Sequence, residues 1–297
     1  MELIGAQKIW SYFGEQTTSV NVSNQTVRSG PGHFVEGYLD LAKKVAELQF
    51  KNREHVLVFR GQPEDYMTKA NKVPRSLLKA TIFRLEGSRI PTPNILESRF
   101  KKLTFAESEL QTAYTEEALE GSDQLRRQRI LRWAILQHYE VCATPLLDVS
   151  HSLRIAASFA THQNTSESAY LFVFGIPNLS GAVTASSEAG LQIIRLASAC
   201  PPDAIRPHIQ EGYLLGEYPE VSDFGAESAY QYGEMDFGRR LVAKFRFNPR
   251  TFLSNVHYPL ATDKALLPSG RRDPLLEITS RIHNKLKTMK FSNHVSP

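Results

Sequence analysis

The order of hydrophobic patterns along the 297-residue chain constrains its fold more than any other feature. In the first half, apolar residues recur at the three- and four-residue spacing typical of helices, over residues 35–50, 95–119 and 125–139. The second half carries runs rich in β-branched and aromatic residues, typical of strands, at residues 169–176, 191–196 and 241–247. A doubly wound sheet would alternate strand and helix throughout, so this order favours an α+β fold.

The same patterns suggest a simple domain organisation. Residues 1–34 mix polar residues with Gly and Pro and predict an irregular lead-in. Residues 35–297 are expected to form a single domain, because no Gly/Ser-rich or Pro-rich linker divides them. Within that domain, residues 63–93 predict a long, partly ordered connection, of the kind that often covers a site. Residues 274–291 predict a basic amphipathic helix, which either docks on its own domain or binds a partner.

Composition restricts the classes of function. Hydrophobic residues make up 41% and aromatic residues 10% of the chain, as in a soluble globular protein. No apolar run approaches the roughly 20 residues of a membrane span, and the N-terminus lacks the pattern of a signal peptide. We therefore expect no membrane partner and a cytoplasmic location. The net charge of +4 permits a nucleic-acid partner without requiring one. Cys142 and Cys200 are too few for a disulfide framework or a cysteine zinc site, and we interpret both as ordinary buried residues.

Several common sites are excluded by absence from the sequence: GxGxxG, GxxxxGK[ST], HExxH and GxSxG do not occur. What stands out instead is HVLVFRGQ at residues 55–62. Val56 to Phe59 predicts a short buried strand that delivers Arg60 to the strand end, where Gly61 frees the backbone. An arginine in such a place can bind an anion.

A second motif spans residues 137–160, QHYEVCATPLLDVSHSLRIAASFA. It begins on a predicted helix that carries His138 on its apolar face. A turn then leads through Leu146 and Leu147 to three polar residues, Asp148, Ser150 and His151. A further helix is expected to pack its alanines inward.

These residues resemble the FRG domain, which is named for its Phe-Arg-Gly motif. The motifs that carry the resemblance follow the family's order: FRGQ, a PxSLL-like segment at Pro74–Leu78, QHY at 137–139, TPLLDVS followed by AASFA, RPHIQEG at 206–212 and ALLPSGRRDPLLEI. The resemblance covers roughly residues 55–280. Two positions depart from it, since Pro145 stands where the family usually has Arg and Val149 where it usually has Trp.

The resemblance implies a relation to the ADP-ribosyltransferase fold, with a mixed sheet at its core. Enzymes of that fold split NAD and pass ADP-ribose to a nucleophile. Arg60, with Gly61 and Gln62, would hold the dinucleotide. Ser150 and His151, at a helix N-terminus, would hold the nicotinamide half. The residues implied in NAD binding also include His138 and Asp148.

The resemblance also implies a carboxylate, because loss of nicotinamide leaves a sugar with oxocarbenium character that a negative charge stabilises. The family's glutamine corresponds to Gln210, and Glu211 lies beside it. If both stood on a strand, they would point to opposite faces. Chemistry favours Glu211 and motif position favours Gln210, with Glu188 and Glu234 as further candidates.

Each of these residues has a structural alternative. Arg60 could pair with Asp148 rather than with a ligand. His138 could make a structural hydrogen bond, and Asp148 could belong to a helix N-cap network. The arginines at 126–132 could form a solvated helix face or a nucleic-acid contact.

The resemblance thus implies an NAD-dependent ADP-ribosyltransferase, a bacterial toxin or phage-defence effector that modifies a macromolecule. The excess of basic over acidic residues favours RNA or DNA as acceptor, and a neutralising antitoxin protein is expected. One alternative is a non-catalytic module that binds phosphate or nucleic acid through Arg60. Another is a metal-dependent nuclease that uses Asp148, His151 and Glu211. The transferase requires Arg60, Ser150 or His151, and Glu211 or Gln210 to line one cleft.

Overall fold

The computed structural model describes residues 8–68, 73–84, 91–178, 180–221, 223, 225, 235–254, 256–268 and 273–289. The chain divides into two compact units, each assembled from three separate stretches. The first unit comprises Met1–Leu78, Val149–Leu179 and Asp236–Pro268. The second comprises Lys79–Asp148, Ser180–Met235 and Ser269–Pro297.

The first unit combines strands and helices in similar proportion. Its elements are β1 (Lys8–Ser11), β2 (Val20–Ser23), α1 (Asn24–Ser29), β3 (His33–Phe34), α2 (Tyr38–Lys51), β4 (Val56–Gln62), the end of β5 (Leu146–Ser150), α6 (Leu153–Thr161), β6 (Ala169–Ile176), η3 (Phe237–Arg240), β10 (Leu241–Phe247), α10 (Pro249–Leu253) and α11 (Asp263–Leu266).

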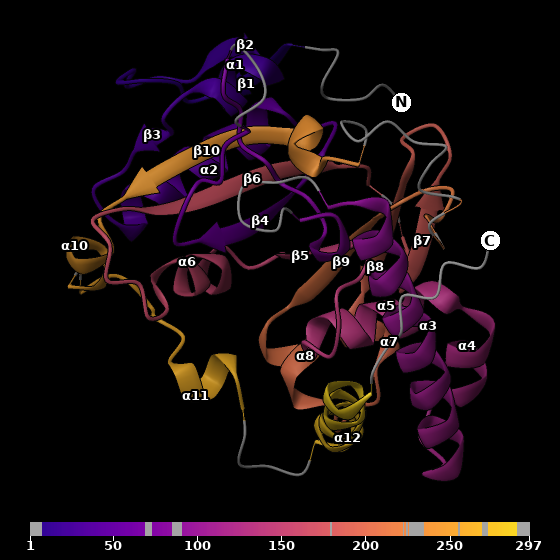
Figure 1. The fold of residues 1–297 in the computed structure, drawn as a ribbon. Helices are drawn as coiled ribbons and strands as arrows, with labels where there is room; N and C mark the ends of the chain where they lie inside the picture. The colour runs from indigo at the N-terminus through magenta and orange to yellow at the C-terminus, as the bar shows by residue number, and fades with distance from the viewer. Residues whose placement is uncertain are drawn as a thin grey trace. The chain divides into compact units, whose positions relative to one another are not determined.

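The strands of this unit form a mixed sheet in the order β3-β10-β6-β4-β5. Strand β3 runs parallel to β10, and the other neighbours are antiparallel. Strand β4 pairs along its length with β6, from Val56↔Ile176 to Gln62↔Tyr170, and it pairs with β5 at Phe59↔Ser150. Figure 1 shows β10, β6 and β4 side by side, with α6 beside β4. The β-branched and aromatic runs of the sequence therefore form the centre of the sheet.

Residues 8–34 are more regular than the sequence predicted. Instead of an irregular lead-in they form the β1–β2 hairpin, α1 and β3, and they bury Ile9, Tyr12 and Val27. The Tyr12 hydroxyl donates to Glu47 of α2, which fastens this segment to the amphipathic helix. The sequence missed these elements because the strands are short and their burial depends on distant partners.

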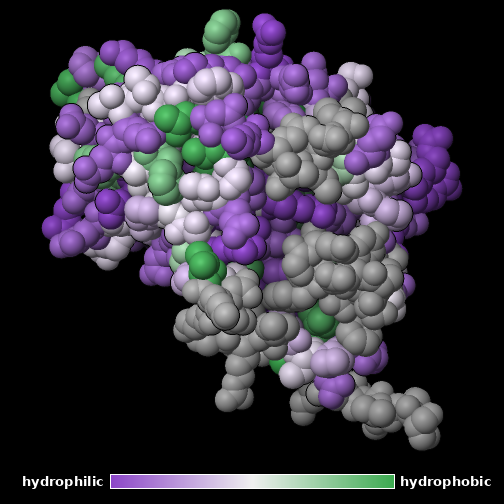
Figure 2. Space-filling model, turned by 90° about the horizontal axis from the view of Figure 1, so that it is seen from above, coloured by the Kyte–Doolittle hydropathy of each residue, from purple (hydrophilic) through white to green (hydrophobic). Residues whose placement is uncertain are grey.

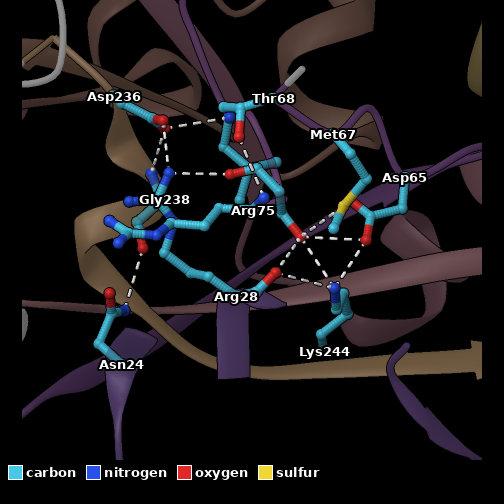
Figure 3. A network of polar contacts seen from close by, with 11 residues as sticks. Asn24, Arg28, Asp65, Met67, Thr68, Arg75, Asp236, Gly238 and Lys244 are labelled. Atoms are coloured by element: carbon cyan, nitrogen blue, oxygen red, sulfur yellow. Dashed lines mark hydrogen bonds and ion pairs between the residues drawn. The ribbon is translucent and has the colours of Figure 1, made fainter. Parts of the chain in front are cut away.

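A buried polar network fastens the segment that follows β4 (Figure 3). Lys244 of β10 is 1% exposed, and its ammonium donates to Asp65 at 2.6 Å and to the Ser76 hydroxyl at 2.9 Å. The Ser76 hydroxyl donates to Asp65 at 3.0 Å. Burial lowers the pKa of Lys244, and the charge of Asp65 opposes that shift. Lys244 thereby holds the two parts of this segment that contain Asp65 and Ser76 against the sheet.

Arg28 of α1 continues this network (Figure 3). Its guanidinium donates to Asp236 at 2.5 Å and to the Ser76 carbonyl at 2.8 Å. Asp236 also accepts from the backbone N–H groups of Leu78 at 3.1 Å and Gly238 at 2.9 Å. The PxSLL-like segment is thus held by distant side chains. Within the predicted connection 63–93, residues 69–72 and 85–90 lie outside the described part of the chain.

The second unit is rich in helices, and its strands β9, β8 and β7 pair antiparallel in that order. Its elements are η2 (Thr81–Phe83), α3 (Pro93–Glu116), α4 (Ser122–Arg127), α5 (Arg129–His138), the start of β5, β7 (Val183–Ser186), β8 (Leu191–Arg195), α7 (Leu196–Ala199), α8 (Ile205–Ile209), β9 (Gly212–Glu217) and α12 (Pro274–Thr288). The helix predicted over residues 125–139 is interrupted at Gln128, which separates α4 from α5.

The C-terminal helix α12 docks on its own unit, the first of the two predicted alternatives. It packs against α3 and buries Leu275, Ile278 and Ile282 on one face. Its basic face forms ion pairs to α3 and the residue that follows it: Lys285 with Glu109 and Arg281 with Glu117. The amphipathic pattern therefore serves intramolecular packing.

The structure confirms the α+β class, because mixed and antiparallel sheets combine with several helices. In the described part of the chain no helix has the length and apolar character needed to cross a membrane. The surface seen in Figure 2 is mostly hydrophilic where its residues are described, and hydrophobic residues appear there in small groups.

Candidate functional site

Arg60 lies half-buried in β4, between the core residue Phe59 and Gly61. Its Nε donates to the Oε1 of Gln62 at 2.9 Å. Gln62 is 9% exposed, and its amide nitrogen donates to the carbonyl of Glu64 at 3.4 Å. Because one buried amide holds the guanidinium and is itself tied to the backbone, Gln62 fixes the orientation of Arg60.

Gly61 permits α6 to approach β4 closely. A Cβ at this position would lie 1.8 Å from the carbonyl oxygen of Ala156 and 2.7 Å from the backbone nitrogen of Ala160. No side chain fits at such distances from a backbone. The Phe-Arg-Gly and Ala-Ala-Ser-Phe-Ala motifs therefore belong to one packing unit, in which the glycine sets the height of the helix over the strand.

Ser150 ends β5, and its hydroxyl accepts a hydrogen bond from the Ser152 N–H at 3.0 Å. Ser152 is the N-cap of α6, and its side chain accepts from the Ile155 N–H at 3.5 Å. The two serines thus form the cap network, whereas Asp148 lies inside the strand. The exposed His151 follows the strand end. Residues 146–150 form a strand rather than the predicted turn.

The register separates Arg60 from Ser150. Opposed residues of an antiparallel pair present their side chains to the same face, and neighbours in a strand alternate. Ser150 is opposite Phe59, so its side chain shares the Phe59 and Gly61 face of the sheet. Arg60 points to the other face, with Gln62. The sequence had not predicted this division.

In the second unit, Gln137 connects α5 to β5. Its amide nitrogen donates to Asp148 at 2.6 Å, and its oxygen accepts from the hydroxyls of Thr81 at 2.7 Å and Thr144 at 2.8 Å. His138 is 5% exposed, and its Nδ1 lies 3.9 Å from Asp148. These contacts show a structural role for Asp148.

Tyr139 and Arg206 connect two further motifs of the resemblance. The Tyr139 hydroxyl donates to the carboxylate of Asp273 at 3.1 and 2.9 Å, and burial followed by the Asp273 charge raises the pKa of Tyr139. Asp273 also caps α12 by accepting from the Leu275 N–H at 3.0 Å. Arg206 donates to Glu140 at 3.0 Å. Sequence reasoning missed Asp273, whose position before Pro274 is a recognisable N-cap signal.

Gln210 and Glu211 lie in the turn between α8 and β9, so the predicted alternation of strand faces does not apply to them. Gln210 is the C-cap of α8 and is 6% exposed. Glu211 is exposed and has φ 46°, in the left-handed region. The further candidate Glu188 is exposed, and Glu234 lies outside the described residues.

The candidate residues are divided between the units. Arg60, Ser150 and His151 belong to the first unit, whereas Gln210 and Glu211 belong to the second. The register does not support a cleft that combines Arg60 with Ser150, and a cleft that combines Arg60 with His151 and with Gln210 or Glu211 stays a prediction.

The arginine cluster at 126–132 makes contacts within the second unit. Arg129 donates from two nitrogens to the buried Glu107, at 2.8 to 3.0 Å, and this carboxylate raises the pKa of Arg129. Arg132 donates to the Leu125 carbonyl at 2.7 Å, and Arg126 pairs with Asp123 at 3.0 Å. Arg129 and Arg132 are thus half-buried against Glu107, whereas Arg126 and Arg127 are exposed.

Neither cysteine has the character of a nucleophile. Both thiols are free, and burial raises the pKa of Cys142 to about 12 and also raises that of Cys200. Among the residues that the structure describes, no three His, Cys, Asp or Glu side chains gather in a way that could hold a metal ion. The nuclease hypothesis gains no support from this part of the chain.

Comparisons with known proteins agree with part of the resemblance. No curated protein and no solved structure matches the chain. A protein-family model, described as FRG domain, matches residues 55–169. The match includes the Phe-Arg-Gly strand, α5, β5 and α6, and it ends before RPHIQEG at 206–212. Over residues 55–169, which contain Arg60, Ser150 and His151, the chain is therefore similar to the FRG domain.

Proposed function

We propose that the protein is an NAD-dependent ADP-ribosyltransferase, a toxin or phage-defence effector that acts in the cytoplasm on a macromolecule. The observation that carries this proposal is Arg60 in its FRG strand. It lies half-buried on a sheet face, with its Nε held by Gln62 at 2.9 Å. A guanidinium fixed in this way loses little side-chain entropy when it binds a pyrophosphate.

The proposed reaction replaces one bond at the ribose by another. The bond between ribose C1′ and the nicotinamide nitrogen breaks, and nicotinamide leaves as a neutral molecule with the bonding electron pair. The nucleophile of the acceptor then bonds to C1′ and loses its proton to a base. Glu211 is the proposed carboxylate that stabilises the intervening oxocarbenium character. Gln210, the motif position, would contribute an amide contact.

The acceptor is proposed to be RNA or DNA, and a neutralising protein partner is proposed to protect the producing cell. The small positive charge of +4 supports the choice of acceptor. Arg126, Arg129 and Arg132 already pair within the second unit, which speaks against α4 and α5 as the source of the contact.

A second candidate is a non-catalytic module that binds phosphate through Arg60. The structural use of Gln137, Tyr139 and Arg206 favours it, because the hydrogen bonds of these motif residues join parts of the second unit to one another. The two candidates differ in whether NAD is consumed.

The test is incubation with NAD labelled in its adenylate part, together with separate RNA, DNA and protein pools. The transferase predicts label on one pool and release of an equal amount of nicotinamide. Arg60→Lys is expected to lose both signals, whereas Arg53→Lys, an exposed residue ahead of the same strand, should retain them. Binding without consumption would support the module instead. Nucleic-acid cleavage that stops on chelation and needs no NAD would support the nuclease.

A further inference from the structure

The outer face of α2 carries an exposed apolar stripe. Leu39 is 47% exposed and Phe50 is 78% exposed, and the exposed Ala46 lies between them. Successive members of this stripe are separated by seven and four residues, so they share one side of the helix. The opposite side of α2 buries Leu41, Val45 and Leu48. Because apolar residues aligned along one exposed face mark interaction sites more often than scattered ones do, this face of α2 is a candidate interface.

A hollow of about 430 Å³ lies at the N-terminal end of the stripe. Leu39 lines it together with Phe34, which is 50% exposed on the edge strand β3, and with Thr251 of α10. The carboxylates of Glu36 and Asp40 also line it, and Asp40 is engaged in an ion pair within α2. The hollow therefore offers apolar walls to an inserted ring, and the exposed Glu36 offers a carboxylate to a cation beside that ring.

The stripe and the hollow complement each other in a two-fold arrangement. Two copies of α2 that pack antiparallel, about an axis through the middle of the helix, place Leu39 of one copy against Phe50 of the other. Phe50 of each copy then enters the hollow beside Leu39 of its partner. The exposed Lys43 lies across from Ala46, whose small side chain leaves room for the lysine stem while the ammonium stays in water.

Charge decides the direction of the helix pair. Glu36 precedes the N-cap of α2 and Arg53 follows its C-cap, and both are exposed. In the antiparallel pair Glu36 of each copy faces Arg53 of the other, so two contacts of opposite charge flank the apolar ones. A parallel pair would oppose Glu36 to Glu36 and Arg53 to Arg53, and each hollow would face the other hollow. An antiparallel second copy is therefore the occupant that the shape and charge of this face fit.

We propose that the protein forms a two-fold dimer through α2, in which Phe50 of each copy fills the hollow lined by Phe34 and Leu39 of the other. One helix pair buries an area at the low end of specific interfaces, below about 1,200 Å² in total, and we expect a dissociation constant on the order of 10 μM. The inference is independent of the proposed transferase, because α2 carries none of the residues assigned to that reaction.

The test is sedimentation velocity of the full-length protein at concentrations from about 1 to 200 μM, a range that brackets the expected dissociation constant. The wild type is expected to change from monomer to dimer across this range. Phe50→Glu and Leu39→Glu should each weaken dimerisation by about 100-fold or more, because two carboxylates would then lie in the apolar contact. Tyr66→Glu is the matched control: Tyr66 is 54% exposed and lies outside the stripe and the hollow, so this variant should dimerise as the wild type does.

An exchange of charges tests the antiparallel direction. Glu36→Arg and Arg53→Glu should each weaken dimerisation by about 10-fold at low salt, because each creates two contacts of like charge. The double variant Glu36→Arg, Arg53→Glu restores both opposite-charge contacts and should dimerise as the wild type does. Arg53→Lys keeps the positive charge and should also behave as the wild type.

Thermal unfolding of each variant shows first that it is folded, as expected for changes at exposed residues. A wild type that stays monomeric up to about 200 μM would overturn the inference, since the stripe would then be left to a different protein or to water. A folded Phe50→Glu variant that dimerises as the wild type does would overturn it too. A double charge variant that dimerises no more tightly than the single ones would refute the antiparallel pair.

Discussion

Gly61→Ala tests the packing that places Arg60. The added Cβ would lie 1.8 Å from the Ala156 oxygen, 2.9 Å from the Ala156 carbonyl carbon and 2.7 Å from the Ala160 nitrogen. Relief requires α6 to move away from β4 by about 1.5 Å, since ordinary contacts exceed about 3 Å. The helix buries Ile155, Ala156, Ala157 and Ala160, so this movement opens the core.

The cost follows from the atoms involved. Overpacking a core costs about 1–3 kcal/mol when side chains can yield, and here backbone atoms obstruct the new methyl group. We therefore expect a loss of about 3 kcal/mol or more in the free energy of unfolding. Replacing glycine by alanine also lowers the conformational entropy of the unfolded chain, which offsets about 0.4–1 kcal/mol of that loss. Phosphate or ADP binding through Arg60 should weaken in parallel, because the strand end moves with the helix.

The assay is equilibrium unfolding in urea, followed by far-ultraviolet circular dichroism. Gly121→Ala is the matched control: its φ is 85° and its Cβ would meet nothing within 4 Å, so about 1 kcal/mol of backbone strain is the expected loss. If Gly61→Ala costs no more than Gly121→Ala, the close approach of α6 does not determine the packing and the reasoning fails.

Three further outcomes are expected. Lys244→Met should destabilise the protein by about 3–5 kcal/mol, because it leaves Asp65 as an uncompensated buried charge. Lys244→Met combined with Asp65→Leu should cost less than Lys244→Met alone, and a double-mutant cycle measures the difference. Burial lowers the pKa of His33 and His55 below the ordinary value of 6.5, so the unfolded chain binds more protons than the folded protein near pH 6. The free energy of unfolding should therefore fall as the pH drops below about 6.5, and the double variant His33→Phe, His55→Phe should show a smaller fall. Asp273→Ala should cost about 2 kcal/mol, since it removes the α12 cap and the Tyr139 bond, and limited proteolysis should then release the C-terminal helix.

The sequence predicted the helices and strands whose apolar spacing is regular over many residues. Strands β6 and β10 were predicted with their observed bounds, and α2, α3 and α12 were predicted to within a few residues, because each has a strong periodicity over many residues. The break at Gln128 was missed because the apolar spacing continues through it. The short strands between residues 8 and 34 were missed because their burial depends on residues far along the chain.

The candidate site was likewise predicted only in part. Arg60 and Gly61 were apparent in the sequence, since a buried run ending in Arg-Gly is a local signal. The pairing of β4 with β6, which places Gln62 opposite Tyr170, joins residues far apart in the chain, and no local pattern encodes it. The strand assumption for Gln210 and Glu211 was wrong because a left-handed residue ends α8 there.

Release of nicotinamide from NAD tests the central claim most directly. The wild type is compared with Arg60→Lys and with Arg53→Lys, each first shown to be folded by thermal unfolding. The account predicts release by the wild type and by Arg53→Lys, and at least a 100-fold slower release by Arg60→Lys, about 2.7 kcal/mol of lost transition-state stabilisation. No release by the wild type in the presence of RNA, DNA and protein acceptors, or equal release by Arg60→Lys, would contradict it.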